Sequence, residues 1–175
     1  AQRYAGQVTR LTSLRFPRYA FVPGERPHPR RHRDGHSYGK AEPRCGPLTE
    51  PWREHTVYCF GIDLFHAGYY WEAHEPWAAV WNASPEPLSS LAEGLIKLAA
   101  AGVKARQGQA RGQAHHARAA AELLRGVGPG VIAGLDTEPA AALAERLADS
   151  WDDDARLPAG GQLGRRRQAP SLARV

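Results

Sequence analysis

The segment FHAGYYWEAHEPWAAVW, residues 65–81, holds the side chains best suited to chemistry. His74 and Glu75 are adjacent in it, and an imidazole beside a carboxylate can transfer protons or bind a divalent metal ion. At about 100° per helical residue, both fall on a stripe beside the aromatic face. We therefore predict His74 and Glu75 as catalytic residues. The alternative for His74 is a half-buried histidine that is hydrogen-bonded to a neighbouring helix or to the N-terminal arm.

A metal ion at this stripe would need ligands from elsewhere in the chain. The HExxH pattern of zinc hydrolases is absent because Ala78 stands where the second histidine would be. His28 and His36, in the proline-rich stretch near the N-terminus, are the imidazoles that we add to His74 and Glu75. These four residues predict a site for a divalent metal ion or a small polar ligand, with hydrolysis as its reaction. The prediction requires the arm to fold back onto the second helix.

The aromatic residues of the same segment support a different, non-catalytic hypothesis. Tyr70 and Trp77 share one face of the helix, and Trp71 lies near its edge. If these rings are exposed, they form a groove that binds a protein partner; if they are buried, they are ordinary core residues. The rival to a ligand site is therefore an interaction module with an aromatic groove.

Charge is distributed unevenly along the chain, whose net charge is +5. Residues 1–44 carry ten Lys or Arg and three Asp or Glu, residues 45–155 carry eight and fifteen, and residues 156–175 carry five and none. Basic ends on an acidic body are typical of nucleic-acid binding through phosphates. We prefer the alternative that the ends lie on the acidic body or in solvent, because they lack interleaved aromatic residues and fixed helices.

Apolar residues at helical spacing predict helices over about residues 51–67, 69–82, 87–107, 109–125 and 138–151. Thr49 and Thr137 are suitable N-caps, and Gly68 and Gly108 are suitable helix stops. The helix over 87–107 is apolar around so broad an arc that we expect it at the centre of a bundle. The fold class predicted is all-α, a compact bundle of about five helices with an extended N-terminal arm rich in Pro, Arg and His.

Prolines divide the chain into three predicted parts. Six prolines between residues 16 and 47 exclude a helix there, and the aromatic residues among them favour packing on the body. We predict an arm over residues 1–48, a helical bundle over 49–151 and a flexible basic tail over 152–175. Cys45 and Cys59 lack the spacing of a zinc site and are expected to be free thiols. No run approaches the roughly 18 apolar residues of a membrane span, so we expect a soluble cytoplasmic protein.

LFHAGYYWEAHE occupies residues 64–75, and GLIKLA occupies residues 94–99. These motifs resemble the central pattern and the next helix of the domain-of-unknown-function family 309. The arm pieces YAFVPG, HP and GHSYG, which begin at residues 19, 28 and 35, are similar too, so the resemblance extends over roughly residues 15–125. It implies an all-helical fold and no established activity. The chain departs from the family pattern at Ala78, where Glu is common, and at Glu93 and Lys97, where Gln is common.

Overall fold

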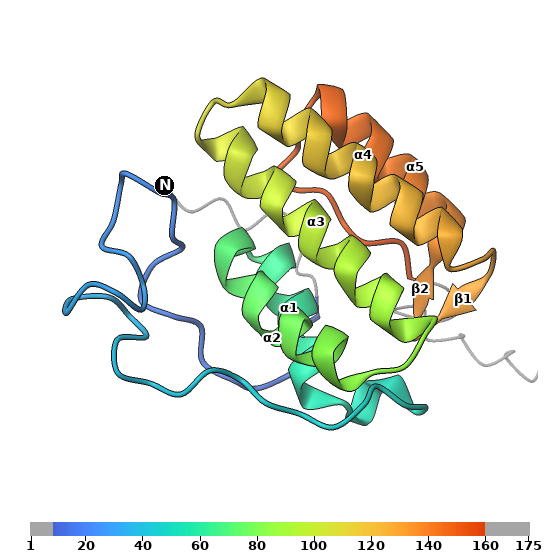
Figure 1. Cartoon of the computed structure of the whole chain (residues 1–175), viewed down its shortest axis with the longest axis horizontal. Helices are drawn as coiled ribbons and strands as arrows, with labels where there is room; N and C mark the ends of the chain where they lie inside the picture. Colours follow the sequence, from blue (N-terminus) through green and yellow to red (C-terminus); the bar gives the residue numbers. More distant parts are fainter. Residues whose placement is uncertain (1–8, 160–175) are drawn as a thin grey trace, which may run out of the picture.

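The computed structural model describes residues 9–159 and shows five α-helices in a bundle (Figure 1). This confirms the all-α class. The helices are α1 (Thr56–His66), α2 (Tyr70–Ala83), α3 (Leu88–Arg106), α4 (Ala110–Gly126) and α5 (Thr137–Asp149). A 3-10 turn, Trp52–Glu54, precedes α1, and two short antiparallel strands, β1 (Val131–Ile132) and β2 (Leu135–Asp136), precede α5.

Helix α3 lies at the centre of the bundle, as its broad apolar arc predicts. It packs against α2 on one side and α4 on the other, while α1 adds to α2 and α5 adds to α4. Leu91, Leu95 and Leu98 project from α3 at helical spacing and are fully buried. Their burial supplies a large part of the apolar contact that holds the bundle together.

The helix boundaries follow local backbone chemistry. Gly68 and Gly108 adopt positive φ angles of 84° and 69°, directly after α1 and α3, and so act as the predicted stops. The predicted cap Thr49 is wrong, because α1 begins later and His55 Nδ1 accepts the N-terminal hydrogen bond from the Tyr58 amide at 3.1 Å. Thr137 is the first residue of α5 rather than its N-cap, and its hydroxyl donates to the Gly128 carbonyl at 2.7 Å.

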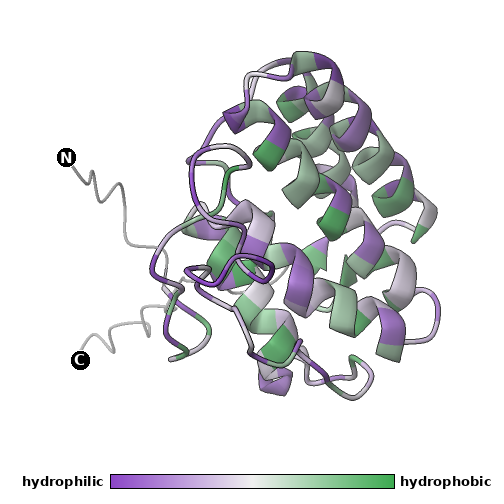
Figure 2. Cartoon of the chain, turned by 60° about the vertical axis from the view of Figure 1, so that its left-hand side comes forward, coloured by the Kyte–Doolittle hydropathy of each residue, from purple (hydrophilic) through white to green (hydrophobic). Residues whose placement is uncertain are grey.

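The arm crosses the outside of α1 and α2 without forming a helix or strand in its described part, residues 9–48. Asp63, a buried residue of α1, accepts hydrogen bonds from the amides of Leu11 and Thr12 at 2.8 and 2.9 Å. Phe16 packs against the ring of Tyr69, at 5.1 Å between centroids. Figure 2 shows the arm as a mainly hydrophilic ribbon lying against the helices, with short hydrophobic stretches. Burial of those stretches fixes the arm to the bundle.

Residues 152–159, which the sequence assigns to a flexible tail, pack against the bundle. Leu157 is buried, and its amide donates to His66 Nε2 at 3.0 Å. Burial lowers the pKa of His66 to about 4, so this ring is a neutral acceptor. The rest of the predicted tail, residues 160–175, lies outside the described residues, as do residues 1–8 of the predicted arm.

Two further expectations concern the cysteines and the membrane. Cys45 and Cys59 are both free thiols. No helix among residues 9–159 combines the length and the apolar character that crossing a bilayer requires.

Replacing Gly61 by Ala is expected to lower the free energy of unfolding by about 1–3 kcal/mol, because overpacking strains a tight core. A Cβ at Gly61 would lie 2.3 Å from Nε1 of the buried Trp77. Gly126→Ala is the control, because nothing lies within 4 Å of a Cβ at that helical position. Urea denaturation followed by tryptophan fluorescence measures both variants. Equal stability of the two variants would contradict the close approach of α1 to α2.

Candidate functional site

The arm and α2 meet at a buried carboxylate. Glu72, in the first turn of α2, is only 4% exposed. Its two oxygens accept hydrogen bonds from the Phe21 amide at 3.0 and 3.1 Å. The His36 ring, itself buried, places Nε2 3.1 Å from Glu72 Oε2. Two separate points of the arm therefore converge on one side chain of the bundle.

Burial moves the pKa values of this pair in opposite directions. Desolvation raises the pKa of Glu72 to about 7, although the hydrogen bond from the Phe21 amide works against the rise. Desolvation also lowers the pKa of His36. His36 Nδ1 lies 2.8 Å from the Ser37 hydroxyl, which can donate to it when Nε2 carries the proton facing Glu72. Burial therefore disfavours the charged form of both groups.

Three histidine rings and Phe21 surround Trp71, the half-buried residue that precedes Glu72. The centroid of the Trp71 ring lies 5.6 Å from that of His28, 6.5 Å from that of His36 and 4.7 Å from that of His74. The arm does fold back onto α2 as the sequence hypothesis requires. His28 and His36 of the arm lie beside the Trp71 ring, as His74 does, and the hydrogen bond that His36 forms to α2 goes to Glu72.

The predicted catalytic residues already have partners in the structure. His74 Nδ1 bonds to the Trp71 carbonyl of its own helix. Glu75 forms a two-point ion pair with Arg30 of the arm. Arg30 Nε donates to Glu75 Oε1, and Arg30 Nη2 donates to Glu75 Oε2 at 2.6 Å. Glu75 thus adds a second, charged attachment of the arm beside that of Glu72.

The structure does not assemble the predicted metal ligands into one set. Among residues 9–159, no group of three or more His, Cys, Asp or Glu side chains is arranged to hold a metal ion. His28 Nδ1 accepts hydrogen bonds from the amides of Arg30 and Arg31 at 3.2 and 3.3 Å. This nitrogen is therefore already bonded within its own turn. His36 is directed to Glu72 rather than to His74 or Glu75.

The predicted aromatic groove is wrong for two of its three residues. Tyr70 and Trp77 are core residues, exposed by 2% and 0%. Trp77 Nε1 donates to the Tyr58 carbonyl at 3.3 Å, and the Tyr70 hydroxyl donates to Asp153 Oδ1 at 2.9 Å. Their shared helical face is turned toward the core, so only Trp71 stays partly accessible.

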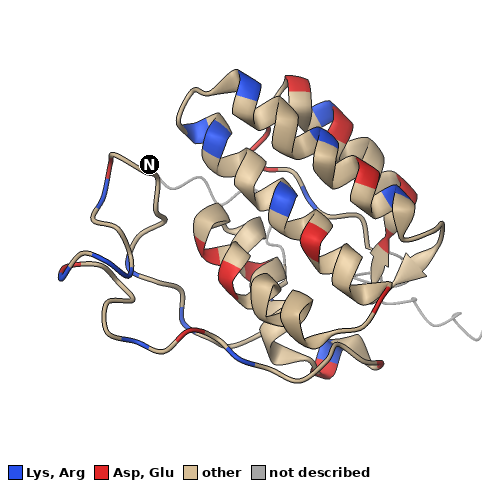
Figure 3. Cartoon of the chain, viewed as in Figure 1, with Lys and Arg blue, Asp and Glu red and all other residues tan. Residues whose placement is uncertain are grey.

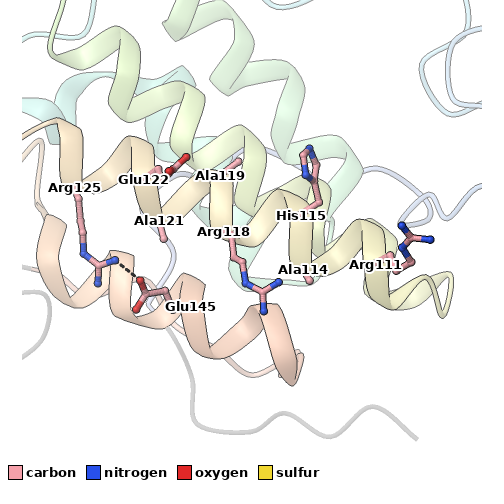
Figure 4. Close-up of a pocket in the computed structure, with 9 residues that line it drawn as sticks. All are labelled: Arg111, Ala114, His115, Arg118, Ala119, Ala121, Glu122, Arg125 and Glu145. Atoms are coloured by element: carbon pink, nitrogen blue, oxygen red, sulfur yellow. Dashed lines mark hydrogen bonds and ion pairs between the residues drawn. The ribbon is translucent and has the colours of Figure 1, made fainter.

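A separate open groove of about 630 Å³ runs along α4 (Figure 4). Arg111, Arg118 and Arg125 repeat along it at a spacing of seven residues. Arg118 pairs with Asp149 of α5 at 3.0 Å, and Arg125 pairs with Glu145. Acids of α5 thus neutralise two of the three arginines.

Sequence reasoning missed the pairing of Glu72 with His36 and that of Glu75 with Arg30. One signal was present: Glu72 lies between apolar residues that turn toward the core, where an acid needs hydrogen-bond donors. Nothing in the periodicity of the arm identifies which of its residues supply those donors.

Replacing Glu72 by Gln is expected to flatten the pH dependence of stability between about pH 5 and about pH 8. The pKa of Glu72 in the folded protein, about 7, lies above its ordinary value. Protonated Glu72 therefore stabilises the folded protein fully at pH values below the ordinary pKa of a glutamate. This stabilisation is lost as the pH rises through about 7. His36 works in the opposite direction, since its pKa is lowered, and the variant retains it.

Urea denaturation at a series of pH values measures this difference. Glu93→Gln is the control, because Glu93 is a half-buried acid of α3 without an ion pair in the described part of the chain. If Glu72→Gln changes the pH profile no more than Glu93→Gln does, the raised pKa of Glu72 is refuted.

Comparison with known proteins gives a match to the family described as "Domain of unknown function (DUF309)", over residues 58–115. This segment spans α1 to α3 and the first turns of α4, about a third of the chain, and includes Glu72, His74 and Glu75. The arm lies outside it. Neither the curated proteins nor the solved structures that were searched include a match. Residues 58–115 are therefore similar to the family DUF309, which the motifs of the chain also resemble.

Proposed function

We propose that this protein is a nucleic-acid-binding module and that its arm supplies the phosphate contacts. The observation that carries the proposal is a set of exposed arm cations that have no ion pair within residues 9–159. The set consists of Arg15, Arg18, Arg26, Arg31, Arg33, Lys40 and Arg44. Cations that form no ion pair are available to displace counterions from phosphates.

The main alternative is that the arm neutralises the acidic helical body. Two arm residues support it: Arg10 Nε lies 3.6 Å from Asp63, and Arg30 pairs with Glu75. Both pairs lie where the arm is attached. The described arm holds nine Lys or Arg and three Asp or Glu, so most of its positive charge is not used in this way. Figure 3 shows Lys and Arg spread along the loops of the arm, away from the acids of α4 and α5.

Five of these cations, all except Arg15 and Arg18, lie on one fixed loop, residues 24–44, which we call the basic loop. The Tyr19 hydroxyl donates to the Pro27 carbonyl at 2.7 Å and accepts from the His36 amide at 3.2 Å, so one side chain joins the two sides of the loop. His36 is attached to Glu72 and Arg30 to Glu75. Because these contacts order the loop in advance, the loop loses less conformational entropy when a ligand binds.

A second candidate function, binding of a small polar ligand, is favoured by the buried pair Glu72 and His36. Their oppositely shifted pKa values are typical of groups that transfer protons. Elemental analysis of protein purified without a histidine tag tests the metal-dependent form, in which His74 is a ligand. One equivalent of bound metal that is lost in His74→Ala supports the metal-dependent form of this function. A trace of metal that is equal in the wild type and in His74→Ala refutes that form.

Nucleic-acid binding is expected to be salt-dependent and to weaken when cations of the basic loop are removed. Arg33→Gln and Lys40→Gln should each lower the slope of log K against log salt by about 0.7–0.9, the contribution of one phosphate contact. Arg146→Gln, which removes an exposed arginine of α5, is the matched control and should leave the slope unchanged. Fluorescence anisotropy of a labelled oligonucleotide, titrated at several salt concentrations, measures the slopes. Binding that is equally strong in both loop variants excludes the arm as the contact surface.

A further inference from the structure

Resting on the proposed function, we infer that the basic loop binds single-stranded nucleic acid and that Tyr38 stacks on an unpaired base. Tyr38 is 54% exposed at a turn of the basic loop. Within residues 9–159 its ring has no aromatic partner and its hydroxyl has no hydrogen bond. It is therefore a free aromatic surface among cations, which is the combination that single-strand-binding proteins use.

The other described tyrosines are all occupied. Tyr58 and Tyr70 are buried with bonded hydroxyls, and Tyr19 bonds to Pro27 and packs against His36 at 4.6 Å between centroids. Tyr69 packs against Phe16. Folding therefore accounts for the position of each of these rings but not for the exposure of Tyr38.

The backbone around Tyr38 is held in place. The Tyr38 amide donates to the Gly35 carbonyl at 3.1 Å, and the Ser37 amide donates to the Pro29 carbonyl at 3.0 Å. Gly35 itself admits no side chain, since a Cβ there would lie 2.3 Å from the Pro29 carbonyl oxygen. The turn is continuous with His36, which Glu72 fixes to α2. Tyr38 is therefore a preorganised surface, and stacking on it requires little further ordering.

Cations lie close enough to this turn to contact the phosphates that flank a stacked base. Arg18 Nη2 donates to the Asp34 carbonyl at 3.2 Å, so this cation lies beside the start of the turn. The Lys40 amide donates to the Ser37 carbonyl at 3.1 Å, so Lys40 extends from the same turn as Tyr38. Arg33 precedes the turn and is exposed.

The shape of the basic loop argues against a duplex. Duplex sequences are read by a helix or a two-stranded ribbon placed in a groove. Residues 24–44 form turns and bends and contain neither element. An irregular loop with one free ring suits bases that are already unstacked, as they are in single strands and RNA loops.

Anisotropy titrations with labelled single-stranded RNA, single-stranded DNA and the corresponding duplex, all of one mixed sequence, test this inference. Tyr38→Ala should weaken binding of the single strands about tenfold, the scale of one lost stacking contact, and should leave duplex binding unchanged. Tyr38→Phe keeps the ring and should restore single-strand binding. Equal loss on RNA and DNA would assign the contact to the base, and a loss on RNA alone would assign it to the ribose 2′-hydroxyl as well.

The outcomes separate this inference from the proposed function. If Tyr38→Ala binds single strands as the wild type does while Arg33→Gln and Lys40→Gln bind less tightly, stacking is refuted and phosphate binding stands. If the wild type prefers the duplex, single-strand selectivity is refuted. If no oligonucleotide binds at low salt, both proposals fail. Because Tyr38 is exposed, its variants should fold normally, which circular dichroism checks.

Discussion

The position of the arm over residues 9–48 depends first on a carboxylate that is almost completely shielded from water. Glu72 lies at the start of α2 among apolar side chains, and a buried acid must find hydrogen-bond donors. It finds them in the Phe21 amide and the His36 ring. Asp63 repeats the arrangement on α1, where it accepts from two consecutive amides of the arm. A chain segment that has no secondary structure of its own is in this way held by side chains of the helices.

This arrangement gives the Glu-Ala-His-Glu segment a structural meaning. Glu72 binds the arm at Phe21 and His36, and Glu75 binds it at Arg30, while the imidazole of His74 bonds within α2. The three arm pieces noted in the sequence contain Phe21, His28 and His36, and each of these residues contacts Trp71 or Glu72. Motifs that are distant in the sequence are thus two halves of one contact. The two carboxylates of this segment, Glu72 and Glu75, both attach the arm.

Sequence periodicity was sufficient to predict the helices, whose apolar residues recur at a regular spacing. The apolar arc of α3 predicted its central place, and Gly68 and Gly108 marked the ends of α1 and α3. The strands β1 and β2 were missed because they are only two residues long and turn at Ala133, a residue that rarely adopts a positive φ. The contacts of the arm could not be predicted either. Proline-rich chain carries no periodicity, and the choice of His36 over His74 as the partner of Glu72 is decided by three-dimensional geometry.

The attachment of the arm also bears on the order in which the chain folds. Each bond from the Phe21 amide to Glu72, and that from Thr12 to Asp63, joins residues 51 positions apart. The helices, in contrast, pack mainly against their neighbours in the sequence, α2 with α3, α3 with α4 and α4 with α5. Closing a long loop loses more chain entropy than forming a helical hairpin, so local hairpins form first in such topologies. We therefore expect the bundle to assemble before the arm docks and the basic loop to reach its final shape late in folding.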